Sequence, residues 1–366
     1  MEVRIPKKTL AEGLGILERI IPNRSSNPIL TYLPITLGDH GLILRGTNGE
    51  IDLEVRLPAE VQGEGYVLVP AQPFSQIVRS LPGELVEMLI KNSPSSGGGI
   101  ELSSANFRTQ LSTANPEGYP ELSFLSGGEE RLPAAKLAQA ITQVRYAAST
   151  EEYRAIFRGV QLELSPRGLR TVASDGFRLS RYDLPLGLTS NRKFVIPARS
   201  ADEIVRVFKD VEAEVSLGVG EGSLTLIGEA VRMAVKLMEG EFPDYGRVIP
   251  QSFVLEATLS AERLRESLKR VAVLSDRNNH RVDLLFAQDR LELVSEGDYG
   301  QGREEIALEA LGEPQLMVAF NAQYLIDALS PIEGTVRLKL SGPTSPTVVE
   351  SVEDKGYLAV VVPLRV

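Results

Sequence analysis

Residues able to carry out nucleophilic, acid–base or metal chemistry are scarce in this chain of 366 residues. Cysteine is absent, which excludes disulfides, thiol nucleophiles and thiolate metal sites. The two histidines, His40 and His280, lie far apart in the sequence and provide little material for a catalytic triad or a metal site. The carboxylates of Glu151-Glu152 and of the stretch Glu239–Asp244 are more typical of solvated loops than of a catalytic pair. These observations favour a protein that is not an enzyme.

Familiar catalytic and phosphate-binding motifs are also missing. Gly97-Gly98-Gly99 follows Ser-Pro-Ser-Ser and opens no helical pattern, so it does not form a P-loop. No HExxH, GxSxG or EF-hand pattern occurs. We therefore predict no metal and no cofactor.

The composition is that of a globular protein, with 43% hydrophobic and 24% charged residues. No apolar run of 18 residues occurs, and the first residues lack the apolar stretch of a signal peptide. We expect a cytoplasmic protein with no membrane segment. The net charge of −10 argues mildly against nucleic-acid binding, but it does not say where the charges lie.

One pattern occurs three times along the chain, at a spacing of about 120–127 residues. Each copy opens with an amphipathic helix, predicted over residues 6–21, 133–148 and 260–275, with Leu10, Leu137 and Leu264 at equal spacing. A strand–turn–strand element follows, marked in the first two copies by Asn48-Gly49 and Asp175-Gly176.

A second helix then follows a strand in each copy, over residues 72–81, 199–209 and 322–329. The predicted fold is therefore α+β, with three repeated domains that each hold two helices and antiparallel sheets. We place the domains at residues 1–122, 130–247 and 251–366. The first and second boundaries fall in the turn-rich stretches Ser123–Arg131 and Gly246–Ser252.

The predicted helices are basic although the chain is acidic. Summed over six helical windows, they carry about +6, so the strands and loops carry the negative charge. If the helices share one face, that face attracts a polyanion through its phosphates without reading bases. Ordinary solvated helix faces also carry Lys and Arg, which is the alternative explanation.

Five stretches in order resemble the bacterial DNA sliding clamp, the beta subunit of DNA polymerase III. Leu169–Leu179 is similar to the family's TVATDGHRL motif, and Glu241–Val248 to its FPDY..V linker. The others are Arg24–Leu30, similar to the loop after the first helix, Phe320–Leu325, similar to FN..YL, and the ending Val361–Val366. The resemblance covers the full length of the chain.

The resemblance implies a head-to-tail homodimer that forms a ring of six domains around duplex DNA and confers processivity on the replicative polymerase. It implies no catalytic activity. The third domain of one chain would meet the first domain of the next. The interface residues would be Phe74, Ile77, Leu81 and Leu111 on one side and Val273 and Leu274 on the other.

The resemblance also implies a pocket that binds short peptides of client proteins, which include the polymerase catalytic subunit, the clamp loader and other replication and repair proteins. Its residues would be Phe157, Ser174, Gly176, Phe177, Arg178, Leu179, Pro243, Arg247, Val248, Asn321, Tyr324, Ser345, Pro346, Val362, Pro363, Leu364 and Arg365. Phe177 replaces a common His and Phe157 a smaller apolar residue, which predicts a pocket of altered shape.

Predicted DNA contacts come from two sources. The resemblance implies Arg24, and placement on the helices suggests Lys136, Arg145, Arg199, Arg206 and Lys269. Two other functions remain open from the residues alone. One is an acidic adaptor that binds proteins without encircling DNA, and the other is an enzyme with carboxylate chemistry on a triplicated α+β scaffold.

Overall fold

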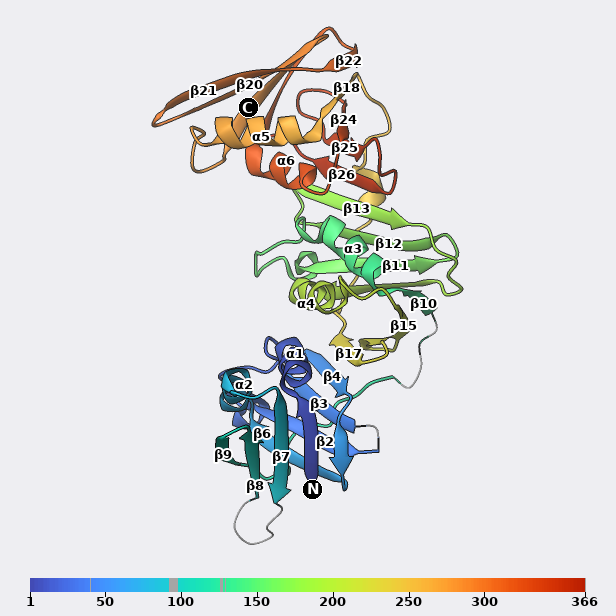
Figure 1. Cartoon of the computed structure of the whole chain (residues 1–366). Coiled ribbons are helices and arrows are strands. Elements are labelled where there is room, and N and C mark those ends of the chain that lie inside the picture. The colour runs from blue at the N-terminus through green and yellow to red at the C-terminus, as the bar shows by residue number, and fades with distance from the viewer. Residues whose placement is uncertain (40, 92–97, 126–127, 129, 366) are drawn as a thin grey trace. The chain divides into compact units, whose positions relative to one another are not determined.

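The computed structural model describes residues 1–39, 41–91, 98–125, 128 and 130–365, so His40 and Gly97 lie outside the described residues. The chain divides into two compact units (Figure 1). Unit 1 comprises Met1–Ala134 and Asp210–Leu237, and unit 2 comprises Ala135–Lys209 and Met238–Val366. The sheets explain why this division does not follow the three repeats, because strands of neighbouring repeats share a sheet within each unit.

Unit 1 contains helices α1 (Lys7–Leu17) and α2 (Ala71–Ser80) and two antiparallel sheets. The five-stranded sheet has the order β5 (Glu60–Gln62), β1 (Glu2–Pro6), β7 (Leu85–Lys91), β8 (Gly99–Ser104), β9 (Phe107–Ser112). The eight-stranded sheet has the order β10 (Glu130–Pro133), β15 (Glu214–Val219), β16 (Ser223–Ile227), β17 (Val231–Lys236), β4 (Ile51–Leu57), β3 (Gly41–Thr47), β2 (Tyr32–Gly38), β6 (Gly65–Pro70).

Unit 2 contains helices α3 (Ala134–Arg145), α4 (Ala198–Phe208), α5 (Ala261–Ala272) and α6 (Ala322–Leu329). Its nine-stranded sheet has the order β14 (Arg192–Pro197), β11 (Gly159–Ser165), β12 (Gly168–Ser174), β13 (Arg178–Leu184), β26 (Tyr357–Val361), β25 (Thr347–Ser351), β24 (Thr335–Leu340), β18 (Leu255–Ser260), β22 (Glu309–Gly312). Its four-stranded sheet has the order β21 (Gly300–Ala307), β20 (Arg290–Gly297), β19 (Arg281–Ala287), β23 (Gln315–Asn321). Short 3₁₀ turns lie at Pro28–Thr31, Ala155–Arg158 and Tyr245–Val248.

The predicted helical periodicity is confirmed in all three repeats, each of which has two helices and antiparallel strands. Leu10, Leu137 and Leu264 are all fully buried, since each lies on the helix face turned to a sheet. The helix ends differ from the predicted bounds because the last apolar residues, such as Ile21, continue the buried face after the helical hydrogen bonds end. None of the described helices is long and apolar enough to span a membrane.

Strands join consecutive repeats edge to edge. In unit 1, β4 of the first repeat pairs with β17 of the second, with Val55 opposite Val231. In unit 2, β13 of the second repeat pairs with β26 of the third, with Arg178 opposite Val361. In both junctions the first partner, β4 or β13, is the second strand of the hairpin β3–β4 or β12–β13. The other partner, β17 or β26, is the last of three consecutive strands, β15–β17 or β24–β26, in the next repeat. The same two strand positions in the remaining repeats are β21 and β9, which are edge strands of their own sheets.

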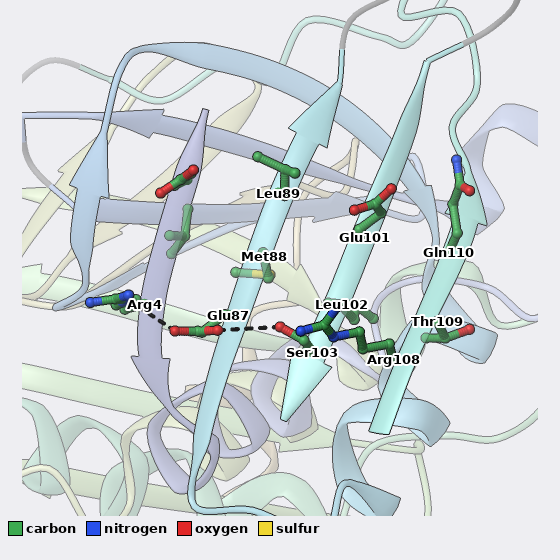
Figure 2. Close-up of a pocket in the computed structure, with 12 residues that line it drawn as sticks. Arg4, Glu87, Met88, Leu89, Glu101, Leu102, Ser103, Arg108, Thr109 and Gln110 are labelled. Carbon is green, nitrogen blue, oxygen red and sulfur yellow. Dashed lines mark hydrogen bonds and ion pairs between the residues drawn. The ribbon is translucent and has the colours of Figure 1, made fainter. Parts of the chain in front are cut away.

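The outward face of the five-stranded sheet is polar and forms a hollow of about 680 Å³ (Figure 2). Along β1 the buried Val3 and Ile5 alternate with the exposed Glu2 and Arg4, as expected for a strand with one face in the core. On the exposed side Arg4 Nε lies 3.1 Å from Glu87 of β7. These exposed charges offer little stabilisation, and we assign no ligand to this face.

Candidate functional site

A cavity of about 530 Å³ in unit 2 gathers most of the residues predicted for the client pocket. Its walls come from the turn between β12 and β13, the segment 242–252 where the second repeat joins the third, and the chain on either side of β25 and β26. The exposed side chains of Phe177, Val248 and Val362 give the cavity an apolar rim. Exposed apolar groups around a recess of this size are typical of a binding site.

The β12–β13 turn holds the side chain of Phe177 in an exposed position. Gly176 has φ +88°, a left-handed backbone conformation that favours glycine over residues with a Cβ. Asp175 Oδ1 accepts hydrogen bonds from the backbone N–H groups of Phe177 and Arg178 at 2.8 and 3.0 Å. Phe177 is therefore held at the rim, where its ring lies 4.9 Å from the guanidinium of Arg154. A cation over the ring stabilises this position.

Arg178 forms the back of the cavity and links two repeats within unit 2. Its guanidinium binds Asp175 at 3.0 Å and Asp327 of α6 at 2.5 Å, and it lies 4.6 Å from the ring of Tyr324. Burial lowers the pKa of Arg178, but the hydrogen bonds and charges of Asp327 and Asp175 outweigh it and raise the pKa. A cation held by two carboxylates in this way has a fixed orientation at the polar end of the site.

The segment 242–252 forms the opposite wall and is anchored by aromatic side chains. Phe242 meets Phe157 edge to face, with ring centroids 5.9 Å apart. The Tyr245 hydroxyl donates to Glu163 at 2.8 Å and accepts from Arg170 at 3.4 Å. Burial, followed by the bond to Glu163, raises the pKa of Tyr245 to about 12.

Beneath this wall lies an apolar cluster. Its buried residues are Val172, Leu179, Val348, Leu358 and Val360, and Phe242, Tyr245, Ile249 and Phe253 pack against it. The cluster draws on strands of two repeats, since β12 and β13 belong to the second and β25 and β26 to the third. The cavity therefore exists only where those two repeats are joined.

The structure brings together most of the predicted pocket residues. Those that line the cavity are Phe157, Ser174, Gly176, Phe177, Arg178, Leu179, Pro243, Arg247, Val248, Ser345, Pro346 and Val362. Those outside its lining are Asn321, Tyr324, Pro363, Leu364 and Arg365.

The residues outside the lining have other contacts. Asn321 caps α6 by accepting from Gln323 N, and Tyr324 stacks on Arg178. Pro363 is buried, and Leu364 N donates to Ala319 O at 2.8 Å, so this end of the chain is bound to β23.

Several lining residues were missed by the sequence analysis. They are Phe242, Asp244, Tyr245, Pro250, Gln251, Ser252, Ser341 and Val360. Three of them lie in the run Glu241–Tyr245, from which only Pro243 was predicted as a pocket residue. The whole run could have been taken, because an aromatic residue on each side of a proline is an apolar signal in a segment that is otherwise polar.

The predicted DNA-contacting residues fall into two groups. Arg24, Lys136 and Arg199 are exposed, and Lys269 is half exposed with Glu266 at 2.9 Å. Arg145 and Arg206 are instead held by carboxylates. Arg145 binds Asp202 at 2.7 Å and the Ala198 carbonyl at 2.9 Å, and Arg206 binds Glu203 at 2.6 Å. The structure uses these two arginines within the second repeat.

The predicted interface set needs correction at two positions. Phe74 and Leu81 are 0% and 2% exposed, so their side chains fill the core of unit 1 and have no surface for a partner. The family resemblance placed both residues at the interface, whereas the structure turns their side chains into the core. Ile77, Leu111 and Leu274 are partly exposed, and Val273 is 78% exposed.

The described residues contain no group of three or more His, Cys, Asp or Glu side chains able to hold a metal ion. The fold and the site together define a protein of three repeated α+β domains with a recess that has an apolar rim and an arginine held by two carboxylates.

Comparison with known proteins gives the family. Models of the DNA polymerase III beta subunit match in three parts, the N-terminal domain at residues 1–123, the central domain at 131–244 and the C-terminal domain at 246–365. The chain belongs to the DNA polymerase III beta subunit family. It is a DNA sliding clamp of the replicative polymerase, a processivity factor without catalytic activity of its own.

Relatives match over the whole chain. The beta sliding clamp of Lactococcus lactis is 29% identical over 378 residues, covering 99% of this chain and 98% of the relative. That of Vibrio cholerae is 27% identical and covers both chains completely. The solved structure of the Bacillus subtilis DNA polymerase sliding clamp has a TM-score of 0.94 at 25% identity, covering 100% of this chain and 99% of that one. The Pseudomonas aeruginosa DNA polymerase III subunit beta has a TM-score of 0.93 at 26% identity, with both chains covered completely.

The anchoring of Tyr245 leads to a prediction about stability. Tyr245→Phe keeps the ring but removes the hydroxyl that Glu163 accepts from, which should lower the free energy of unfolding by about 1–2 kcal/mol at neutral pH. Because the folded-state pKa lies above the unfolded value of about 10, the wild-type protein should lose stability as the pH rises from about 10 to 12. The variant should lose less over that range.

Urea unfolding at pH 8 and at alkaline pH measures both effects. Tyr153→Phe is the control, because Tyr153 is 76% exposed. The assignment is wrong if Tyr245→Phe and Tyr153→Phe behave alike at both pH values.

Proposed function

We propose that the cavity of unit 2 is the pocket through which this clamp binds its clients, and that each client inserts a short linear peptide. The combination of an apolar rim with buried polar anchors supports this proposal most directly. Phe177 and Val248 offer apolar surface, while Arg178 can bind a carbonyl or carboxylate of the peptide. Clients would include the polymerase catalytic subunit, the clamp loader and other replication and repair proteins, all in the cytoplasm.

The three domains would be residues 1–122, 130–247 and 251–366. Their helices would face the DNA, with Arg24, Lys136, Arg199 and Lys269 as phosphate contacts. Such contacts position a duplex without reading its bases, and their affinity falls with salt. This is the behaviour that sliding needs. The acidic adaptor and the enzyme are not favoured by the family.

Ring closure would follow from the strand pairing already present inside the chain. At the junctions, β4 pairs with β17 and β13 pairs with β26. The strands equivalent to β4 and β13 in the third repeat and to β17 and β26 in the first repeat are β21 and β9, and both are edge strands. An edge strand presents a row of unpaired N–H and C=O groups that another strand can bind. Pairing of β21 with β9 of a second copy would be a head-to-tail contact, and two such contacts would close a ring.

The repeats also suggest the register of that pairing. At the two junctions, Val235 lies opposite Ile51 and Val361 lies opposite Arg178. The residue of β9 equivalent to Val235 and Val361 is Leu111, and the residue of β21 equivalent to Ile51 and Arg178 is Gly300. Gln110 of one copy would then lie opposite Gln301 of the next. Both glutamines are exposed, and Gln110 is seen on the edge strand β9 in Figure 2. In the predicted interface, Leu111 on β9 and Val273 with Leu274 after α5 would lie at this contact, and Ile77 near it.

The pocket is tested by peptide affinity. Phe177→Ala and Val248→Ala should each weaken a fluorescent peptide carrying the clamp-binding segment of the polymerase catalytic subunit by about ten- to a hundredfold, because each removes apolar contact. Leu311→Ala is the matched control, since Leu311 is an exposed apolar residue of unit 2 outside the cavity. Equal affinities in all three variants, measured by fluorescence anisotropy, would exclude this pocket.

The register is tested by a disulfide. The chain has no cysteine, so Gln110→Cys with Gln301→Cys provides the only thiols, and opposed strand positions have the spacing that a disulfide needs. Mild oxidation should give a crosslinked dimer on a non-reducing gel. Gln110→Cys with Glu305→Cys is offset by about 13 Å along the strand and should stay monomeric on that gel. The reverse pattern, or no crosslink in the first pair, contradicts the register.

A further inference from the structure

A buried carboxylate at the junction between the first two repeats lies under three arginines. Glu54 of β4 is opposite Arg45 of β3 on one side and opposite Arg232 of β17 on the other (Figure 1). Arg56 lies two residues further along β4, so its side chain is on the same face of the sheet. The side chain of Glu54 is 3% exposed, whereas those of the arginines are 30–37% exposed. The carboxylate therefore lies beneath, and the guanidinium groups form the outer surface.

Each of these arginines approaches the carboxylate of Glu54 through its Nε atom. Arg45 Nε lies 2.9 Å from Oε2, Arg56 Nε lies 3.0 Å from Oε1, and Arg232 Nε lies 4.0 Å from Oε1. Arg45 Nη1 also donates to Thr36 Oγ1 at 3.0 Å. The other five terminal nitrogens are Nη2 of Arg45 and both Nη atoms of Arg56 and of Arg232. None of them has a hydrogen-bond partner among the described residues, so they are charged donors available to a ligand.

The cluster carries a net positive charge. Burial raises the pKa of Glu54, but the hydrogen bonds and charges of Arg45 and Arg56 outweigh burial and lower it, so the carboxylate is ionised at neutral pH. Three guanidinium groups over one carboxylate leave a net charge of about +2. The next carboxylate along β4, Asp52, lies on the side of Glu54 away from Arg56. It accepts from Thr47 Oγ1 at 2.6 Å and from Ser123 N at 3.2 Å.

The equivalent positions at the second junction have different chemistry. Since Ile51 of β4 and Arg178 of β13 are equivalent, the counterpart of Glu54 is Arg181. Arg181 lies opposite Val172 on one side and Leu358 on the other, in the places of the two flanking arginines. Both of these apolar residues belong to the cluster beneath the cavity of unit 2. Strand pairing at a junction therefore does not require the arginines, and their presence at the first junction needs another explanation.

We propose that the three-arginine cluster of Arg45, Arg56 and Arg232 binds a phosphoryl group with at least two negative charges. Inorganic pyrophosphate and the terminal phosphate of a nucleotide are two sources of this chemistry. Guanidinium groups form paired hydrogen bonds with phosphate oxygens, and contact with Glu54 through Nε leaves their terminal nitrogens for the ligand. A dianion also matches the charge of the cluster. A phosphodiester carries one negative charge and should bind more weakly.

Isothermal titration calorimetry with the full-length protein in magnesium-free buffer tests the proposal. Inorganic pyrophosphate and thymidylate are the probes for the two sources, and dimethyl phosphate is the singly charged control. At least one probe should bind about tenfold more tightly than dimethyl phosphate. Binding of pyrophosphate alone identifies the free anion as the ligand, and binding of thymidylate identifies a nucleotide. Either result supports the proposal.

Arg232→Gln is the variant of choice, because its Nε has the longest of the three distances to Glu54 and its loss disturbs the buried carboxylate least. It should weaken the bound probe about tenfold, since it removes two donors and one positive charge. Arg4→Gln is the matched control. Arg4 is an exposed arginine of the other sheet of unit 1, paired with Glu87, and its replacement should leave the affinity unchanged.

The proposal is overturned if neither probe binds the wild-type protein, or if dimethyl phosphate binds as tightly as the probes. Equal probe affinity in Arg232→Gln and Arg4→Gln, both shown to be folded by circular dichroism, also overturns it. Should Arg232→Gln not fold, Arg56→Gln takes its place with the same expected loss. None of these results depends on the proposed client pocket, whose residues belong to unit 2.

Discussion

Edge-to-edge strand pairing between repeats is the interaction on which the rest of this structure depends. Each pairing commits a row of backbone N–H and C=O groups that would otherwise be exposed, and it extends one sheet across two repeats. The side chains at these junctions can vary widely, because the backbone supplies the bonds. Val55 faces Val231 at one junction, whereas Arg178 faces Val361 at the other. This tolerance is consistent with a clamp that retains its fold at 25–29% identity to its relatives.

The cavity proposed as the client pocket is a consequence of one of these junctions. Val172 and Leu179 come from the second repeat and Val348 and Val360 from the third, and the segment 242–252 between the repeats covers them. Arg178 lies at the junction and binds Asp327 of the third repeat. Because Arg178 both lines the cavity and binds the third repeat, the shape of the cavity depends on how the second and third repeats are joined. The junction between β4 and β17 has a buried carboxylate instead. There Glu54 is buried beneath Arg45 and Arg56, which hold its pKa down against the effect of burial.

Sequence reasoning found what depends on local periodicity and missed what depends on partners in space. The helices of all three repeats were predictable because their apolar residues recur at helical intervals. Pocket residues in the β12–β13 turn were predictable by family resemblance. The core positions of Phe74 and Leu81 were not predictable, because apolar residues at helical spacing look the same in the sequence whether they pack in the core or against a partner chain. The ion pair of Arg145 could not be recognised in the sequence, since its partner Asp202 lies 57 positions away.

The most direct test of the account is topological. The clamp, loaded onto a nicked circular duplex, should stay bound through gel filtration and should dissociate quickly once a restriction enzyme cuts the circle. This result is expected because a closed ring holds DNA by enclosing it, while its basic helices bind phosphates weakly enough to slide. Equal dissociation rates before and after the cut would contradict the claim that the strand edges of two copies close a ring around DNA.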